Sequence, residues 1–194
     1  WEMVVDLFAG AQSLKKGVRG KQREYVPLDK RGKVWSHAHQ GWVRNEKYDV
    51  MKMTPEETVE RVREVFRGRH GKVRRVKVKL WWASPDCRTF SKMDSMNEKH
   101  GQFREWQKGG GRQPKREGKG ELTEKGRRAH QADDMMRRTM EVLDWVHQLK
   151  AEHRQMTEGQ KCKEEARLGV FLDFSEVEVA LENPTGSLAE QKYM

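Results

Sequence analysis

The chain has 194 residues, with 40 Lys or Arg against 30 Asp or Glu and a formal net charge of +10 at pH 7. This length suits one apolar core and excludes two cores of ordinary size, and the positive charge favours a polyanion such as nucleic acid as partner. The only cysteines are Cys87 and Cys162, too few for a disulfide framework or a multi-cysteine zinc site.

Short apolar runs that end in a turn or an acidic residue predict strands in the first fifty residues. They lie at 3–8, 25–28 and 48–50. The first run is followed by Ala9-Gly10, and we expect a helix to begin near Leu14.

A capping pattern predicts the first long helix. Thr54 stands at the N-cap position, Pro55 follows it, and Glu57 completes a capping box. The helix is expected to run to about Arg67 and to stop at Gly68. Its buried residues are expected to be Val59, Val62 and Phe66.

In the second half of the chain, predicted strands again alternate with predicted helices. A period of two predicts a strand over 73–83, with an apolar side formed by Val76, Val78, Leu80 and Trp82. The basic, glycine-rich composition at about 92–128 predicts a mobile loop or insertion. Apolar residues at steps of three and four predict a helix over 130–150, and a polar stretch follows to Arg167. Further short strands are predicted within 169–174 and 177–181.

Strands that alternate with helices predict an α/β fold, a mostly parallel Rossmann-like sheet with helices on both faces. Ligands of such sheets bind beyond the carboxyl ends of the strands. The segments that follow the apolar runs are therefore the candidate site: 6–10, Asp29, Asp49, 84–87 and 182–184. Asp29 follows Asp6 by 23 positions, near the spacing of about 20 residues typical of a ribose-binding acid. Ordinary turn and cap residues are the alternative interpretation.

Three blocks occur in a fixed order: DLFAG at 6–10, ASPDCRTFS at 83–91, and ENP at 182–184 followed by TGSL. Together they resemble the cytosine-5 DNA methyltransferases that use S-adenosylmethionine, and most of all the phage, viral and algal-type branch. The resemblance implies a Rossmann-like methyltransferase fold. It also implies that residues 1–194 are a partial catalytic domain, since the family continues with an arginine-bearing motif, a target-recognition region and a closing cofactor motif.

The same resemblance implies where S-adenosylmethionine would bind. Phe8 would lie against the adenine, the backbone near Gly10 would face the methionine part, and Asp29 would accept the ribose hydroxyls. The remaining implied cofactor residues are Asp6, Ala9, Asp49, Val50 and Pro85, with Asp49 accepting from the adenine amino group.

The catalytic pair implied by the family is Cys87 and Glu182. The Cys87 thiolate would add to carbon 6 of a flipped-out cytosine, while Glu182 would hold or protonate ring nitrogen 3. The partner would be double-stranded DNA that contains cytosine. The implied substrate-binding residues are Ser84, Arg88, Ser91, Asn183 and Pro184.

One departure from the family pattern keeps an alternative open. Asp86 stands where this branch has a second proline, and a carboxylate beside a thiol disfavours the thiolate unless a cation such as Arg88 offsets it. The chain could then be an inactive, methyltransferase-like module that binds nucleic acid. A methyltransferase acting on RNA or on a base amino group is a third possibility.

Two further features bear on partners and location. The segment 61–79 carries nine Lys or Arg and one acid, which suits either phosphate binding or a solvated basic surface. No apolar run reaches the roughly 18 residues of a membrane span, and no signal-peptide pattern begins the chain. We expect an intracellular protein, nuclear in a eukaryote or its virus and cytoplasmic in a prokaryote. His37 and His39 are expected to lie at the surface rather than to bind a metal.

Overall fold

The computed structural model describes residues 1–10, 12–18, 20–37, 39–71, 75–85, 103–107, 111–118 and 120–182. The protein is α/β and divides into two compact units. Unit 1 comprises Trp1–Ala83 and Thr139–Leu181, and unit 2 comprises Ser84–Arg138 and Glu182–Met194.

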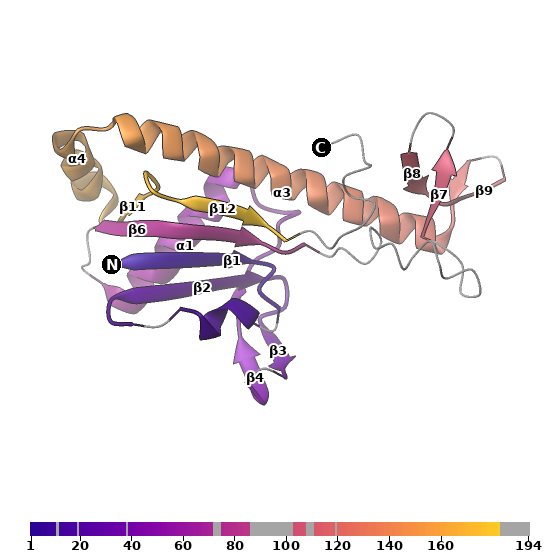
Figure 1. The fold of residues 1–194 in the computed structure, drawn as a ribbon, viewed down its shortest axis with the longest axis horizontal. Coiled ribbons are helices and arrows are strands. Elements are labelled where there is room, and N and C mark those ends of the chain that lie inside the picture. The colour runs from indigo at the N-terminus through magenta and orange to yellow at the C-terminus, as the bar shows by residue number, and fades with distance from the viewer. Residues whose placement is uncertain are drawn as a thin grey trace. The chain divides into compact units, whose positions relative to one another are not determined.

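A parallel sheet forms the centre of unit 1 (Figure 1). Its strands are β1 (Glu2–Leu7), β2 (Arg23–Asp29), β5 (Glu46–Lys47), β6 (Arg75–Ala83), β11 (Phe171–Asp173) and β12 (Glu178–Leu181). The order across the sheet is β5-β2-β1-β6, and both β11 and β12 then pair with β6. Counted along the chain this is 3-2-1-4-5, the order of a Rossmann-type sheet.

One face of the sheet carries the apolar core. Met3, Val5 and Leu7 of β1 are all fully buried on this face. The register shifts between Met3 and Val4, so that Met3 pairs with Val78 but Val4 pairs with Leu80. The residues of β6 on the core face are consequently Val76, Val78, Trp81 and Ala83, each 0% exposed. The predicted alternation is therefore right for the first half of β6 and wrong for Leu80 and Trp82, because the irregularity moves them to the opposite face.

Three helices accompany the sheet: α1 (Pro55–His70), α3 (Glu124–Gln155) and α4 (Glu158–Leu168). In Figure 1, α1 lies behind the sheet. The crossovers from β5 to β6 and from β6 to β11 progress in the same direction, so right-handed connections place their helices on the same face. Accordingly, α1, α3, α4 and β11 together line a cavity of about 560 Å³.

The expectation of helices on both faces is wrong for the part of the chain that the structure describes. In its described residues, the crossover from β1 to β2 contains a short 3-10 helix, η1 (Ser13–Lys16), in place of the helix expected from Leu14. Its N-cap, Gln12, is left-handed and makes no capping side-chain bond, and Gly17 ends the turn. The crossover from β2 to β5 contains an antiparallel hairpin of β3 (Lys33–Ser36) and β4 (Gly41–Arg44) instead of a helix.

The predicted start of α1 is confirmed. The Glu57 N–H donates to Thr54 Oγ1 at 3.2 Å, and the Thr54 N–H donates to Glu57 Oε2 at 2.7 Å. The predicted end is wrong, because Gly68 has open space around it and the helix continues to His70 before Gly71 ends it. The three residues expected to be buried are indeed buried.

Other boundaries also differ from the expectations. The third strand occupies 46–47 rather than 48–50. The helix expected over 130–150 extends over 124–155, and part of the polar stretch that follows it is α4. Within the segment at about 92–128, expected to be a mobile loop or an insertion, the described residues include β7 (Arg104–Gln107), β8 (Gly111–Pro114), β9 (Arg116–Glu117), β10 (Glu121–Leu122) and the start of α3. The strands expected within 169–174 and 177–181 are present as β11 and β12.

Unit 2 is organised around the first part of α3. Arg104 of β7 is 0% exposed, and its guanidinium donates to Asp133 Oδ1 at 2.6 Å and to Asp133 Oδ2 at 3.2 Å. It also donates to the Ala129 carbonyl at 3.1 Å. Gly126 faces the backbone of Lys115 so closely that a Cβ atom there would lie 1.9 Å from the Lys115 carbonyl oxygen. The strands of unit 2 are thus joined to α3 by a buried ion pair and a close backbone approach.

No helix in the described part of the chain combines the length and the apolar character needed to cross a membrane.

Candidate functional site

The carboxyl ends of three parallel strands bring several predicted residues to one edge of the sheet. Leu7 pairs with Leu28, and Asp29 pairs with Lys47, so β1, β2 and β5 end at the same level. The loop that follows Leu7, the end of β2 and the segment that follows Lys47 therefore meet at this edge. They contain the predicted cofactor residues Phe8, Ala9, Gly10, Asp29, Asp49 and Val50, and Asp6 lies within the last residues of β1.

The loop after β1 has an unusual backbone. Phe8, Gly10 and Gln12 have positive φ angles of 63°, 43° and 58°. A non-glycine residue in this region costs roughly 1–2 kcal/mol, so such a loop persists only where its surroundings hold it. The Gly10 N–H donates to Asp29 Oδ2 at 3.0 Å, and Asn45 Nδ2 donates to the Gly10 carbonyl at 3.1 Å. These bonds fix the loop against the ends of β2 and the hairpin.

Asp29 organises this edge through both carboxylate oxygens. Besides the Gly10 N–H on Oδ2, its Oδ1 accepts from the Arg31 N–H at 2.7 Å and lies 3.4 Å from Arg31 Nε. Only 8% of the side chain is exposed. The contacts give Asp29 a role in fixing two turns, and the implied contact with a ribose stays a prediction.

A second polar connection involves two residues that the sequence did not reveal. The buried Gln12 donates through Nε2 to the Arg44 carbonyl at 2.6 Å and to Asn45 Oδ1 at 2.8 Å. Asn45 in turn donates to the Arg31 carbonyl at 3.3 Å. Gln12 and Asn45 are 33 positions apart, so no local spacing marks them as a pair. They attach the β3–β4 hairpin to the loop after β1.

Asp6 lies on the face of the sheet opposite to the apolar core. It is 2% exposed, and the Tyr25 hydroxyl donates to its Oδ2. Burial, the hydrogen bond to Asp6 and the nearby carboxylate charge all raise the pKa of Tyr25, so the hydroxyl remains a donor at neutral pH. The buried hydrogen bond joins β1 to β2, and the cofactor role of Asp6 stays a prediction.

Asp49 and Val50 differ in accessibility. Asp49 keeps 27% of its side chain exposed, and its Oδ1 accepts from the Met51 N–H at 3.3 Å. Val50 is only 3% exposed. At this edge Asp49 and Phe8 are half-buried and keep side-chain surface exposed to solvent, whereas Val50 contributes mainly to packing.

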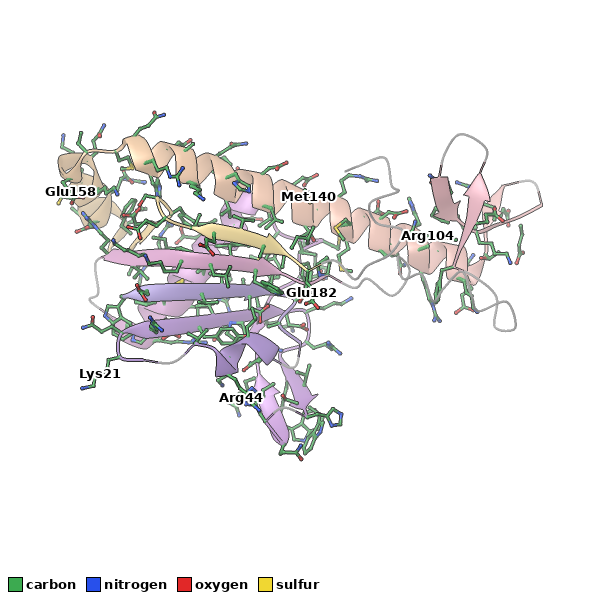
Figure 2. The ribbon with its side chains drawn as sticks, viewed as in Figure 1. Lys21, Arg44, Arg104, Met140, Glu158 and Glu182 are labelled. Carbon is green, nitrogen blue, oxygen red and sulfur yellow. The ribbon has the colours of Figure 1, made fainter. Side chains whose placement is uncertain are left out.

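The implied catalytic segments begin at two paired strands. Ala83 of β6 is the register partner of Leu181 of β12, and the next residues along the chain are Ser84 and Glu182. Ser84 is half-buried, Pro85 is buried, and Glu182, at the end of β12 in Figure 2, is exposed. The other implied catalytic and substrate-binding residues lie outside the described residues: Cys87, Arg88, Ser91, Asn183 and Pro184.

The basic segment 61–79 is largely ion-paired. Arg69 binds Glu24 and Glu46, and Arg75 binds Glu158 and Glu165. Further pairs join Arg61 with Glu46 and Glu64, Arg63 and Arg67 with Glu60, Lys77 and Lys79 with Glu176, and Lys79 with Glu2. These contacts favour the interpretation of a solvated basic surface over that of a phosphate-binding patch.

The two neighbouring histidines occupy the turn of the hairpin. His37 is exposed, and His39 Nε2 lies 3.3 Å from the Gln12 carbonyl oxygen. Among the residues with described positions, no three His, Cys, Asp or Glu side chains form a group that could hold a metal ion.

Comparison with protein-family models, with curated proteins and with solved structures finds no match to this chain.

Proposed function

We propose that the chain supplies catalytic and cofactor-binding residues of an S-adenosylmethionine-dependent DNA (cytosine-5)-methyltransferase with a Rossmann-like methyltransferase fold. The observation that carries the proposal is the agreement between three ordered sequence blocks and the 3-2-1-4-5 strand order. Each block begins at, or directly after, the carboxyl end of a parallel strand, where α/β sheets bind their ligands.

The loop after β1 is the proposed cofactor site. S-adenosylmethionine would supply an electrophilic methyl group when bound. The polar contacts of Gly10 hold the loop backbone in one conformation, so little ordering is needed upon binding. Phe8 and Asp49 retain accessible surface for an adenine ring, whereas Asp29 would have to share its carboxylate between the ribose and the Gly10 and Arg31 N–H groups.

The proposed chemistry needs a nucleophile and an acid on the same base. The Cys87 thiolate forms a bond to carbon 6 of cytosine, and Glu182 neutralises the charge that develops at ring nitrogen 3. With the cofactor bound, carbon 5 would take its methyl group as the S–CH3 bond breaks and S-adenosylhomocysteine leaves. Loss of the carbon 5 proton to a base would then expel the thiolate from carbon 6 and give 5-methylcytosine. The register of Ala83 with Leu181 supports this pairing, because the two catalytic segments leave the sheet side by side.

Methyl transfer tests the proposal directly. The full chain is incubated with S-adenosylmethionine and cytosine-containing duplex DNA, and 5-methylcytosine is measured by mass spectrometry of the nucleosides. Cys87→Ala should abolish the product, and Glu182→Gln should lower the rate by roughly 100-fold or more. The matched control is Cys162→Ala, which removes an exposed free cysteine of α4 and should leave the rate unchanged. No product from the wild-type chain, or full activity in Cys87→Ala, would contradict the proposal.

A second candidate is a methyltransferase-like module that binds nucleic acid without catalysis. The engaged carboxylate of Asp29 favours it, because both oxygens already accept from backbone N–H groups. Calorimetry separates the two candidates: the enzyme should bind S-adenosylmethionine, whereas the module should bind DNA in a salt-sensitive way and leave the cofactor unbound.

A further inference from the structure

The β3–β4 hairpin presents an unusual outward face. Its strands are in antiparallel register, with Val34 opposite Val43 and Trp35 opposite Trp42. On the inward side, Val34, Ser36 and Val43 are buried, as the period of two along each strand requires. The outward side therefore carries Lys33, Trp35, Trp42 and Arg44.

Two tryptophans are exposed on this face. Trp35 is 46% exposed and Trp42 is 62% exposed, and their rings meet edge to face with centroids 5.9 Å apart. Large aromatic side chains at the surface cost solvation free energy and commonly mark a binding site. The two ring planes are nearly perpendicular, at 82°, so each ring offers its own separate aromatic face to a base.

The same face is strongly cationic. From 30 to 45 the chain has four Lys or Arg and no Asp or Glu. Lys33 and Arg44 are direct cross-strand partners, and Lys33 Nζ lies 5.5 Å from the centroid of the Trp42 ring. Like charges placed opposite each other destabilise a hairpin, and no carboxylate among the described residues pairs with either one. A bound anion would relieve this repulsion.

The hairpin is also held firmly in unit 1. Gln12 bonds to the Arg44 carbonyl and to Asn45, which directly follows β4, and Arg44 ends that strand in Figure 2. His39 at the turn lies against the Gln12 carbonyl oxygen. Such attachment favours a binding surface of fixed geometry over a freely moving arm.

We propose that the outward face of the β3–β4 hairpin binds unpaired nucleotides of single-stranded nucleic acid. Bases stack on Trp35 and Trp42, and the neighbouring phosphates are neutralised by Lys33 and Arg44. A pair of cations beside a pair of aromatic rings suits the neighbouring phosphates and bases of a single strand. In a duplex the bases are already stacked on each other, so they cannot use this surface unless they are flipped out.

The experiment measures binding without S-adenosylmethionine, so its outcome is independent of methyl transfer. Fluorescein-labelled oligothymidine and oligouridine of twelve nucleotides, and a duplex of equal length, are titrated with the full chain and followed by anisotropy. We expect either or both single strands to bind more tightly than the duplex, and their relative affinity identifies DNA or RNA as the ligand.

The variants test the two parts of the surface separately. Trp42→Ala and Trp35→Ala should each weaken single-strand binding by about 5-fold or more, with Trp42→Phe intermediate. Lys33→Gln and Arg44→Gln should each lower the salt-dependence exponent by about 0.7. The matched controls are Met51→Ala, which removes an apolar side chain that is 50% exposed outside the hairpin, and Lys52→Gln; both should bind normally.

Three results would overturn the proposal. The first is unchanged single-strand affinity in both tryptophan-to-alanine variants. The second is tighter binding of the duplex than of either single strand. The third is a change of oligomeric state in the tryptophan variants, seen by light scattering, with no loss of nucleic-acid binding; it would assign the hairpin to contact with a second copy of the chain.

Discussion

The two units of the protein are stabilised in different ways. In unit 1 the largest fully buried side chains are apolar or aromatic, with Trp81, Phe66 and Phe174 among them. In the described part of unit 2, the buried apolar residues of α3 are Ala129, Ala132 and Met136, and the largest buried side chain is that of Arg104. Unit 1 therefore depends on apolar burial, whereas the described part of unit 2 relies on a buried ion pair and a close backbone contact.

This difference follows from the composition of the two regions. A parallel sheet covered by amphipathic helices gathers apolar side chains from many strands, whereas short polar strands beside one helix have few to bury. Removing one partner of a buried ion pair is costly, because the remaining charge cannot regain water. Unit 2 should consequently be sensitive to single polar or steric changes that an apolar core would tolerate.

The largest effect is expected from Arg104→Met. It leaves the Asp133 carboxylate buried without the guanidinium and should lower the free energy of unfolding of unit 2 by about 3–5 kcal/mol. Hydrogen exchange of β7 and β8 measures the loss. The matched control is Arg128→Met, which breaks an exposed ion pair with Glu124 and should cost less than about 1 kcal/mol. Equal effects of the two substitutions would contradict the account of unit 2.

A similar effect is expected from Gly126→Ala. The added Cβ would lie 1.9 Å from the Lys115 carbonyl oxygen, so the backbone must move apart, at a cost of about 3 kcal/mol. Gly68→Ala in α1 meets nothing within 4 Å and should instead stabilise by about 0.5–1 kcal/mol, because alanine favours the helix. Thermal unfolding with hydrogen exchange by segment distinguishes them. Stabilisation by Gly126→Ala would refute the close contact.

A smaller, pH-dependent effect is expected in unit 1. His153 Nδ1 accepts from the Phe174 N–H at 3.0 Å, and the ring packs against Phe171 and Phe174. Burial lowers the pKa of His153, although the Asp173 carboxylate, with Oδ1 4.0 Å away, acts in the opposite direction; the other nearby charges are Lys161, Glu152 and Glu164. The folded ring therefore binds a proton less readily than the unfolded one.

Stability should accordingly fall as the pH drops below the ordinary histidine pKa of about 6.5. For one proton, the free energy of unfolding can fall by at most about 1.4 kcal/mol per pH unit, and this limit applies to the part due to His153. Urea unfolding at pH 7.5 and 5.5 measures it, and His153→Gln should remove this part of the dependence while keeping an acceptor for the Phe174 N–H. The same pH dependence in wild type and variant would exclude His153 as its source.

Local signals in the sequence correctly predicted the start of α1 and the strands β1 and β2. The start of α1 depends on Thr54, Pro55 and Glu57 alone, and its capping box forms as expected. The apolar runs of β1 and β2 are likewise short-range patterns, and their pairing follows from the connections between them. The alternation of strands with helices also predicted a mostly parallel sheet, which the structure confirms, whereas the order of its strands was not predicted.

Features that depend on distant contacts were missed. The register between β1 and β6 shifts between Met3 and Val4, and this shift moves Trp82 away from the core face. No sequence pattern within β6 predicts it. The helix expected from Leu14 shortens to one turn, because Gln12 is held left-handed by contacts with Arg44 and Asn45, more than thirty positions away. The hairpin could have been found, since Val34 and Val43 alternate with the two tryptophans around a turn ending at Gly41.

The central claim is that Cys87 adds covalently to a cytosine held by Glu182. The most direct measurement uses duplex DNA carrying 5-fluorocytosine, in which the fluorine at carbon 5 prevents the release of the enzyme after methyl transfer. With S-adenosylmethionine and the full chain, a denaturation-resistant adduct should form, and peptide mass mapping should locate the modified base on Cys87. An adduct that persists in Cys87→Ala, or none in the wild-type chain, would contradict the account.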